Sequence, residues 1–235
     1  MTSTRRERLR RLDAAGLYFV CDGLPGGRVP SALLDAALRG GADIIQLREK
    51  APRSDEELVS LADPFRRAAA ERGALFVLND RPDLVTACGA DGVHLGQDDV
   101  PVTAAREKAG IDAVIGLSTH SREELDVACA AEGDDRPDYL SVGPIWATPT
   151  KEGRPATGLE YVRYAAANST LPWFAIGGIE PANVGDVVAA GATRIVVVRA
   201  IREAEDPEAA ARTLHGALKA APGGRDREDA TTGVR

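Results

Sequence analysis

Short apolar runs rich in β-branched residues alternate along the chain with segments whose apolar residues recur at helical spacing. This alternation is typical of repeated strand–helix units. Eight runs are predicted as strands: 17–21, 43–48, 75–79, 92–95, 114–117, 139–142, 173–176 and 194–198. Eight strand–helix units in about 220 residues favour a closed (β/α)₈ TIM barrel of the α/β class over an open doubly wound sheet. No GxGxxG follows the first run, so the dinucleotide-binding open sheet has no support.

Local signals mark where individual helices begin. Ser54 and Glu57 have the spacing of a capping box after the second strand, and Ser121 and Glu124 repeat it after the fifth. Pro64 lies inside the first of these two helices, and we expect a kink or a break there because proline removes a backbone donor.

Composition narrows the class of protein. We expect one TIM-barrel domain over residues 1–221, followed by a polar, aperiodic tail at 222–235 that is disordered. The formal net charge of −7 argues against a nucleic-acid partner, whose binding needs a basic surface. No apolar run approaches the length of a membrane span or a signal-peptide core, and the three cysteines are scattered, so we expect a cytoplasmic protein without a membrane partner.

The second predicted strand carries polar residues on one face. Side chains alternate along a strand, so Gln46 and Arg48 point one way while Ile45 and Leu47 point the other. The apolar pair has to face the helices, which places Gln46, Arg48 and, if the strand continues, Lys50 at the barrel mouth. Burying cations without partners is costly. The alternatives are a structural ion pair with barrel carboxylates or a site for a polyanion.

Carboxylates follow the third and fourth strands. Asp80 and Asp99 end neighbouring strands, which lie roughly 5 Å apart, so their side chains can converge on one hard cation. Mg²⁺ is commonly held by one or two carboxylates together with substrate phosphates. Asp98 is an alternative to Asp99. Each aspartate could instead only cap the helix that follows it.

Two later loops carry further candidate ligands. Thr148, Thr150 and Lys151 are donors after the sixth strand, in a chain that has only four lysines. Gly177 and Gly178 end the seventh strand, and loops after strands seven and eight of such barrels often bind phosphate through backbone N–H groups. A tight turn explains the glycine pair equally well.

The histidines offer no metal pattern. His94 and His120 lie at or near strand ends and His215 lies on the last helix, with spacings unlike those of a zinc site. A single histidine inside a barrel is more often a packed, hydrogen-bonded residue than a ligand.

Taken together, the motifs resemble those of the thiamine-phosphate synthase family. The matching segments are QLREK (46–50), ND (79–80), HLGQDD (94–99), GLSTH (116–120), SVGPIWATPTK (141–151) and AIGGI (175–179). The resemblance implies a (β/α)₈ barrel. It also implies a transferase that joins a pyrimidine diphosphate to a thiazole phosphate, or to its carboxylated tautomer, with one Mg²⁺ per active site.

Carried onto this chain, the resemblance assigns three groups of residues. The pyrimidine diphosphate would be held by the 46–50 segment and by isolated later residues: Gln46, Leu47, Arg48, Glu49, Lys50, Asn79, Ser118 and Lys151. Asp80 and Asp99 would bind Mg²⁺. The thiazole phosphate would be held by Thr148, Pro149, Thr150, Gly177 or Gly178, Val198 and Arg199. Relatives often have a small hydroxyl residue where this chain has Arg199.

The implied mechanism is dissociative. Arg48, Lys50, Lys151 and Ser118 are the catalytic candidates, because they stabilise charge on the departing diphosphate. The thiazole nitrogen then attacks a pyrimidine-stabilised carbocation with its own lone pair, so no general base is needed. The rivals are a thiazole tautomerase with the same barrel, which would need an acid/base residue such as His94 or His120, and a non-catalytic sensor of a phosphorylated ligand. A homo-oligomer is compatible with the sequence.

Overall fold

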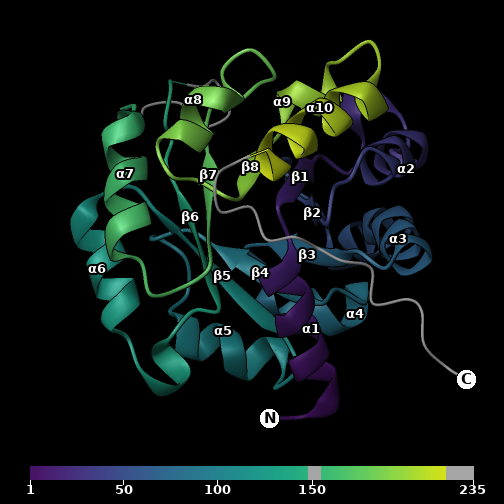
Figure 1. Ribbon diagram of the computed structural model, residues 1–235. Coiled ribbons are helices and arrows are strands. Elements are labelled where there is room, and N and C mark those ends of the chain that lie inside the picture. Colours follow the sequence, from purple (N-terminus) through teal and green to yellow (C-terminus); the bar gives the residue numbers. More distant parts are fainter. Residues whose placement is uncertain (148–154, 221–235) are drawn as a thin grey trace, which may run out of the picture.

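The computed structural model describes residues 1–147 and 155–220, and its centre is a closed barrel of eight parallel strands in sequential order, with β8 hydrogen-bonded back to β1 (Figure 1). The strands are β1 (Leu17–Cys21), β2 (Ile44–Leu47), β3 (Leu75–Asn79), β4 (Gly92–Leu95), β5 (Val114–Thr119), β6 (Tyr139–Val142), β7 (Trp173–Ile176) and β8 (Ile195–Val197). The predicted fold class is therefore confirmed. Five strands have the predicted bounds, and the other three differ by at most two residues at an end.

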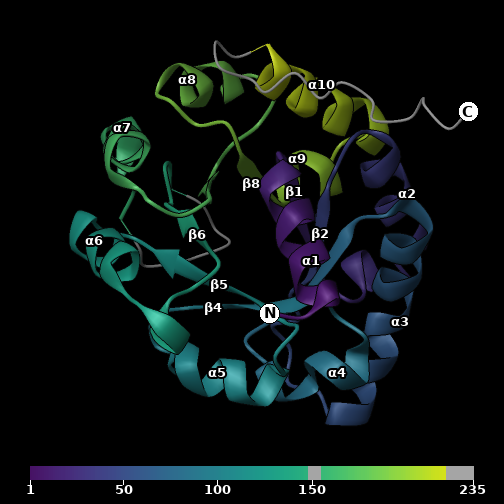
Figure 2. The ribbon, with the colours of Figure 1, turned by 60° about the horizontal axis from the view of Figure 1, so that its bottom comes forward.

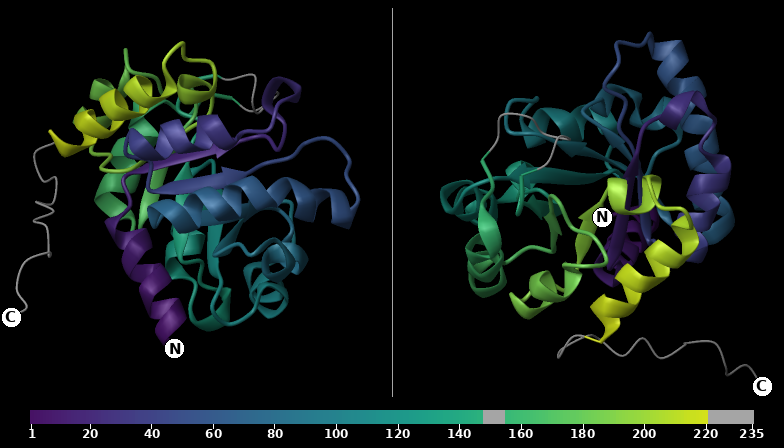
Figure 3. Two further views of the ribbon diagram at one scale, coloured as in Figure 1. Left: turned by 90° about the vertical axis from the view of Figure 1, so that its right-hand side faces the viewer. Right: turned by 90° about the horizontal axis from the view of Figure 1, so that it is seen from above.

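Helices surround the barrel and connect successive strands (Figure 3). They are α1 (Ser3–Ala14), α2 (Ser31–Arg39), α3 (Asp55–Arg72), α4 (Val85–Cys88), α5 (Val102–Ala109), α6 (Arg122–Ala130), α7 (Gly158–Asn168), α8 (Val184–Ala189), α9 (Arg199–Arg202) and α10 (Pro207–Lys219), with short 3₁₀ turns at Pro25–Gly27, Pro82–Leu84 and Gly133–Asp135. Within residues 1–147 and 155–220, no helix combines the length and apolar character needed to cross a membrane.

Alternation along each strand divides the core into two layers. Ile45 and Leu47 of β2 belong to the large cluster between strands and helices, together with Phe65 of α3. Ile44 belongs to the cluster inside the barrel, together with Tyr18 of β1. The parity inferred from the sequence therefore holds, and polar residues that share the parity of Ile44 face the interior.

Helix α1 closes the barrel at the amino ends of the strands (Figure 2). Leu12 packs into the cluster inside the barrel. Arg8 pairs with Asp91 at 2.8 Å and Arg5 pairs with Asp138 at 2.6 Å, and each aspartate directly precedes a strand. The sequence analysis did not predict this helix. Because it fills the amino end, the carboxyl ends of the strands are left for a site.

The start of α3 agrees with the prediction, and the helix continues past the proline inside it. Ser54 Oγ accepts from the backbone N–H of Glu57 at 3.2 Å, and the Glu57 carboxylate accepts from the N–H of Ser54 at 2.8 Å, so the capping box is complete. The helix continues through Pro64 to Arg72, so of the kink or break expected there, the break does not occur. The apolar face around Phe65, which is fully buried, holds the helix against the barrel on both sides of the proline.

Candidate active site

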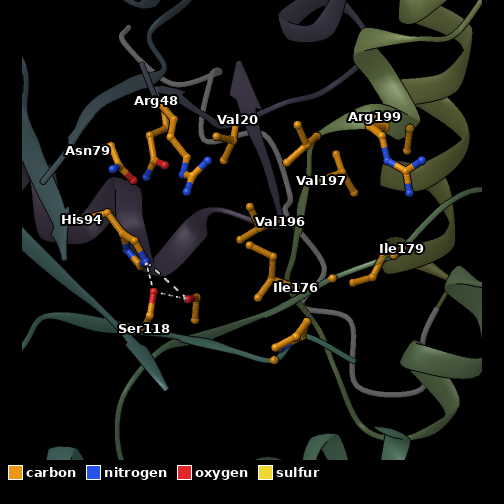
Figure 4. Close-up of a pocket in the computed structure, with 18 of the residues that line it drawn as sticks. Val20, Arg48, Asn79, His94, Ser118, Ile176, Ile179, Val196, Val197 and Arg199 are labelled. Carbon is orange, nitrogen blue, oxygen red and sulfur yellow. Dashed lines mark hydrogen bonds between the residues drawn. The ribbon is translucent and has the colours of Figure 1, made fainter. Parts of the chain in front are cut away.

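A cavity of about 720 Å³ opens at the carboxyl ends of the strands (Figure 4). Strands β2 to β6 and the loops after them contribute mainly polar lining residues: Gln46, Arg48, Asn79, Asp80, His94, Asp99, Ser118 and Ser141. Strands β7, β8 and β1 with their following loops contribute mainly aliphatic ones: Ile176, Ile179, Val196, Val197, Val198 and Val20. The site is therefore a cavity with one polar wall and one aliphatic wall.

The segment after β2 divides between the cavity and its surroundings. Gln46 and Arg48 line the cavity, as the alternation predicted, and Gln46 is only 3 % exposed. The Leu47 side chain is buried in the helix-facing cluster, so only its backbone is available to a ligand. The Glu49 carboxylate accepts from the N–H of Ala51 at 3.0 Å, and Glu49 is not among the described residues that line the cavity.

Lys50 lies beside the main cavity. It lines an adjoining hollow of about 430 Å³ together with Arg48, Arg199 and Arg202. Arg202 is paired with two carboxylates, Asp22 at 2.7 Å and Glu203 at 2.8 Å. Arg48 and Arg199 line both spaces, on either side of strand β1. This edge of the site is consequently rich in positive charge.

The two predicted carboxylates meet at the cavity mouth. Asp80 has φ of 61°, a left-handed conformation that is uncommon for residues other than glycine and is concentrated at functional sites. Burial raises the pKa of Asp80 to about 6, assisted by the charge of Asp99 and a hydrogen bond with it, while Arg48 and Asn79 act in the opposite direction. The Asp99 carboxylate also accepts from the N–H of Gly96 at 2.6 Å.

This pair has the chemistry of a site for a hard cation. Two carboxylates that disfavour each other's charge are stabilised when a cation lies between them. Among residues 1–147 and 155–220, no group of three or more His, Cys, Asp and Glu side chains is arranged to hold a metal. Asp80 and Asp99 could offer such a cation two carboxylates, and Mg²⁺ commonly completes its shell with substrate phosphate and water. Asp98 also lines the cavity, but the carboxylate that helps to raise the pKa of Asp80 is that of Asp99.

Ser118 and His94 form part of a buried polar cluster. His94 Nε2 lies 3.0 Å from Ser118 Oγ (Figure 4) and 3.3 Å from Ser141 Oγ. His94 Nδ1 lies 3.2 Å from Tyr139 Oη. The prediction that His94 is a packed, hydrogen-bonded residue is confirmed. Both ring nitrogens have side-chain partners, which is unfavourable for an acid/base role in turnover.

Sequence reasoning missed three members of this cluster. Tyr18, Tyr139 and Ser141 point into the barrel, and Gln46 Nε2 donates to Tyr18 Oη at 2.5 Å. The tyrosines lie in otherwise apolar runs, where their rings suggest only core packing. The signal that could have found them is the alternation of side chains along a strand. Tyr18 and Val20 are two residues apart in β1, and both point into the barrel.

The loop after β7 approaches the loop after β6 closely. Gly177 has φ of 106°, and a Cβ on it would lie 2.6 Å from Pro144 Cα. Gly178 has φ of 69°, and a Cβ there would lie 2.9 Å from Trp146 Cβ. Both glycines line the cavity, so their backbone is exposed to a ligand. The turn requires glycine for its own packing, whether or not a phosphate binds there.

The remaining candidates lie at the end of β8 or outside the described residues. Val198 caps α9 and lines the cavity with Arg199, the first residue of that helix. The four candidates of the loop after β6 are outside the described residues: Thr148, Pro149, Thr150 and Lys151. The predicted disordered tail at 222–235 is outside them as well.

Comparison with known proteins adds three findings. A family model described as thiamine monophosphate synthase matches residues 17–201. The thiamine-phosphate synthase of Acidothermus cellulolyticus is 53% identical over 208 residues, covering 88% of this chain and 96% of the relative, and that of Arthrobacter sp. (strain FB24) is 49% identical over 229 residues, covering 89% and 96%. The solved structure of thiamine phosphate pyrophosphorylase from Pyrococcus furiosus has a TM-score of 0.79 and 31% identity, covering 90% of this chain and 99% of that one.

Proposed function

The chain belongs to the thiamine monophosphate synthase family and is a transferase of that type; from this premise we propose its substrates, its metal and the role of each site residue. The proposed reaction joins 4-amino-2-methyl-5-(diphosphooxymethyl)pyrimidine to 4-methyl-5-(2-phosphooxyethyl)thiazole, or to its carboxylated tautomer, and releases thiamine phosphate and diphosphate. The observation that carries the proposal is the asymmetry of the cavity. Its polar wall brings Arg48 next to the neighbouring carboxylates of Asp80 and Asp99.

Asp80 and Asp99 would hold one Mg²⁺ per active site. The support is the pKa of Asp80, which burial raises to about 6 with a smaller contribution from the charge of Asp99. When bound, the ion supplies positive charge to the oxygens of the diphosphate. Arg48 lies close enough to lower the pKa of Asp80, so it is placed to contact the same anion.

The other proposed contacts to the pyrimidine diphosphate are inferred from which residues line the cavity and the adjoining hollow. Arg48, Lys50 and Lys151 stabilise the growing charge on the departing oxygen. Lys50 approaches from the adjoining hollow, which Arg48 also lines. Gln46, Asn79 and Ser118 hold the substrate from the polar wall. The 47–49 backbone contributes as well, whereas the Leu47 and Glu49 side chains do not.

The thiazole phosphate would bind across the cavity, at the aliphatic wall. Backbone N–H groups of Gly177 and Gly178 and of Val198–Arg199 meet the phosphate, and Thr148, Pro149 and Thr150, which are outside the described residues, are assigned to the same phosphate. Aliphatic side chains suit the ring, since they bury its surface without competing for hydrogen bonds. The thiazole nitrogen attacks the pyrimidine-stabilised carbocation with its lone pair, so no residue has to remove a proton.

The polar wall favours this reaction over a thiazole tautomerase. A tautomerase has no use for the paired carboxylates of Asp80 and Asp99, and His94, one of its two candidate acid/base residues, is engaged at both ring nitrogens by Tyr139 and Ser118. A non-catalytic sensor would not need paired carboxylates. We further propose a cytoplasmic enzyme whose residues 1–221 form one domain, acting on small molecules without nucleic acid or membrane.

The test is turnover with defined substrates. The protein is incubated with the pyrimidine diphosphate and the thiazole phosphate, with and without Mg²⁺, and thiamine phosphate and free diphosphate are measured by mass and by a coupled assay. We expect equal amounts of both products, only with the metal. Isomerisation of a thiazole phosphate without diphosphate release would support the tautomerase, and binding without any product would support the sensor.

A further inference from the structure

A continuous chain of hydrogen bonds crosses the interior of the barrel from Gln46 to Ser118. Gln46 Nε2 donates to Tyr18 Oη at 2.5 Å, and Tyr18 Oη lies 3.1 Å from Tyr139 Oη. Tyr139 Oη lies 3.2 Å from His94 Nδ1, and His94 Nε2 lies 3.0 Å from Ser118 Oγ. All five residues are at most 9 % exposed. This hydrogen-bond chain therefore joins two residues of the polar wall through the protein and not through solvent.

The middle of the hydrogen-bond chain depends on a glycine, which leaves room where any other residue would have a side chain. Gly116 of β5 is level with His94 of β4 on one side and with Tyr139 of β6 on the other. A Cβ at position 116 would lie 2.5 Å from His94 Nδ1 and 2.5 Å from Tyr139 Oη. Gly116 thus lets the two rings meet across the intervening strand, with centroids 5.5 Å apart.

The number of available hydrogens gives the hydrogen-bond chain a direction. A tyrosine hydroxyl has one hydrogen, and Tyr18 already accepts from Gln46. Its own hydrogen is satisfied by donation to Tyr139, the other partner that its hydroxyl has among the described residues. Tyr139 must then donate to His94 Nδ1, which leaves the proton of a neutral imidazole on Nε2.

That direction determines what Ser118 can offer. With the proton on Nε2, His94 donates to Ser118 Oγ, and Ser141 Oγ also donates to Ser118 Oγ at 3.3 Å. The hydrogen of Ser118 is then left for the cavity, where an anion needs a donor. If the amide of Gln46 were turned over, Tyr18 would donate to its oxygen and each later bond would reverse. Ser118 would then donate to His94 and could only accept from a ligand.

We propose that His94 is a positioning residue for Ser118, and that the Gln46 amide sets its tautomer through Tyr18 and Tyr139. In the Nε2–H tautomer, His94 makes the Ser118 hydroxyl a donor to an anionic ligand. The inference rests on the proposed function in one respect: Gln46 and Ser118 contact the same diphosphate substrate. A substrate that fixes the Gln46 amide thereby also fixes the donor at the other end.

The first test measures the tautomer directly and needs no turnover. Protein labelled with ¹⁵N-histidine contains three histidines, and the His94 signals are assigned by difference from His94→Gln. At pH 8 we expect the Nε2–H tautomer in the wild type. Gln46→Glu supplies only an acceptor to Tyr18, so its His94 should become Nδ1–H. Tyr139→Phe, which removes the donor to Nδ1, should leave a mixture.

The second test asks whether the effect passes through Ser118. Tyr139 is not among the described residues that line the cavity, so Tyr139→Phe changes the hydrogen-bond chain without removing a ligand contact. We expect kcat/KM for the pyrimidine diphosphate to fall roughly 5- to 10-fold, as for the loss of one hydrogen bond. In a Ser118→Ala background the same change should have less than about a 2-fold effect, because the two act as a unit. KM for the thiazole phosphate should stay unchanged.

Tyr161→Phe is the matched control, since Tyr161 of α7 is also a buried tyrosine but lies outside this chain of bonds. It should change neither the tautomer nor the kinetics. The proposal is overturned by an Nδ1–H tautomer in the wild type, by the same tautomer in wild type and Gln46→Glu, or by equal effects of Tyr139→Phe in the two backgrounds. Failure of the wild type to make thiamine phosphate would instead contradict the proposed function, and the tautomer spectra would still decide the role of His94.

Discussion

The two walls of the cavity are built in the same way from the barrel strands, but one wall is polar and the other is aliphatic. Each wall consists of inward-facing residues from consecutive parallel strands, yet β2 to β6 present Gln46, His94 and Ser118, while β7 and β8 present Ile176 and Val196. Because the barrel closes between β8 and β1, the walls face each other across one space. A single cavity can thus hold an anion against donors and a ring against aliphatic side chains, so each half can be tested separately.

The largest effect is expected from the carboxylate pair of the polar wall. Asp80→Ala and Asp99→Ala should each lower Mg²⁺-dependent activity by roughly 10³-fold or more, since the metal's charge stabilisation is worth several kcal/mol. The fold should survive, because each change removes one of two neighbouring like charges. Activity is measured over a range of Mg²⁺, with unfolding curves for each variant. Asp98→Ala is the control, and loss of the Mg²⁺ response in that variant alone would move the site to Asp98.

The next effect separates chemistry from binding. Lys151→Ala should lower kcat on the order of 10²-fold, because a cation that meets the departing diphosphate acts mainly in the transition state. Steady-state kinetics with each substrate varied in turn would measure it, and Lys108→Ala, a change of the same type in helix α5, serves as the control. If only the thiazole KM changes, the two phosphate sites are reversed.

The aliphatic wall should give a smaller change of a different kind. Ile176→Ala removes apolar contact without touching a charge, so KM for the thiazole phosphate should rise roughly 10-fold with little change in kcat. Ile176 suits this purpose better than Gly178, where any Cβ would meet Trp146 at 2.9 Å. Ile111→Ala, at an exposed position, is the control. A fall in kcat with the KM for the thiazole phosphate unchanged would contradict the division between the walls.

The smallest effect concerns pH and the metal-free protein. The pKa of Asp80 is raised from its ordinary value of 3.8 to about 6, so between these values the folded state binds more protons than the unfolded state. Stability should therefore decrease as pH rises through this window. Unfolding of the wild type and of Asp80→Asn would be compared at several pH values between 4 and 7 without metal. A difference between the two that stays constant with pH would refute the assignment.

The polar wall could be predicted from the sequence because its polar residues stand in otherwise apolar strands. Gln46 and Arg48 interrupt an apolar strand, and parity alone showed which way they point. The aliphatic wall gave no such signal, since Ile176 and Val196 look like ordinary core residues of a strand. Their role depends on which end of the barrel is open, and that follows from helix α1.

Helix α1 was not predicted from the sequence, for a related physical reason. Its sequence is strongly polar, and its buried contact is made largely by Leu12. The arginines that hold it find carboxylates far along the chain, a pairing that only the closed barrel creates. Likewise, the contact of His94 with Tyr139 requires Gly116 between them, and one glycine in a strand does not reveal which rings will use the space.

The same arginine pairs also constrain the order in which the molecule assembles. Arg8 reaches Asp91 across 83 residues and Arg5 reaches Asp138 across 133, so α1 is synthesised before either of its carboxylate partners and lacks a complete docking site until the chain has reached β6. Contacts with such long chain separation form late, because the entropy of closing the intervening loop has to be offset first. Helix α1 is therefore expected to be among the last elements to dock, and its docking reports that the strands as far as β6 are in place.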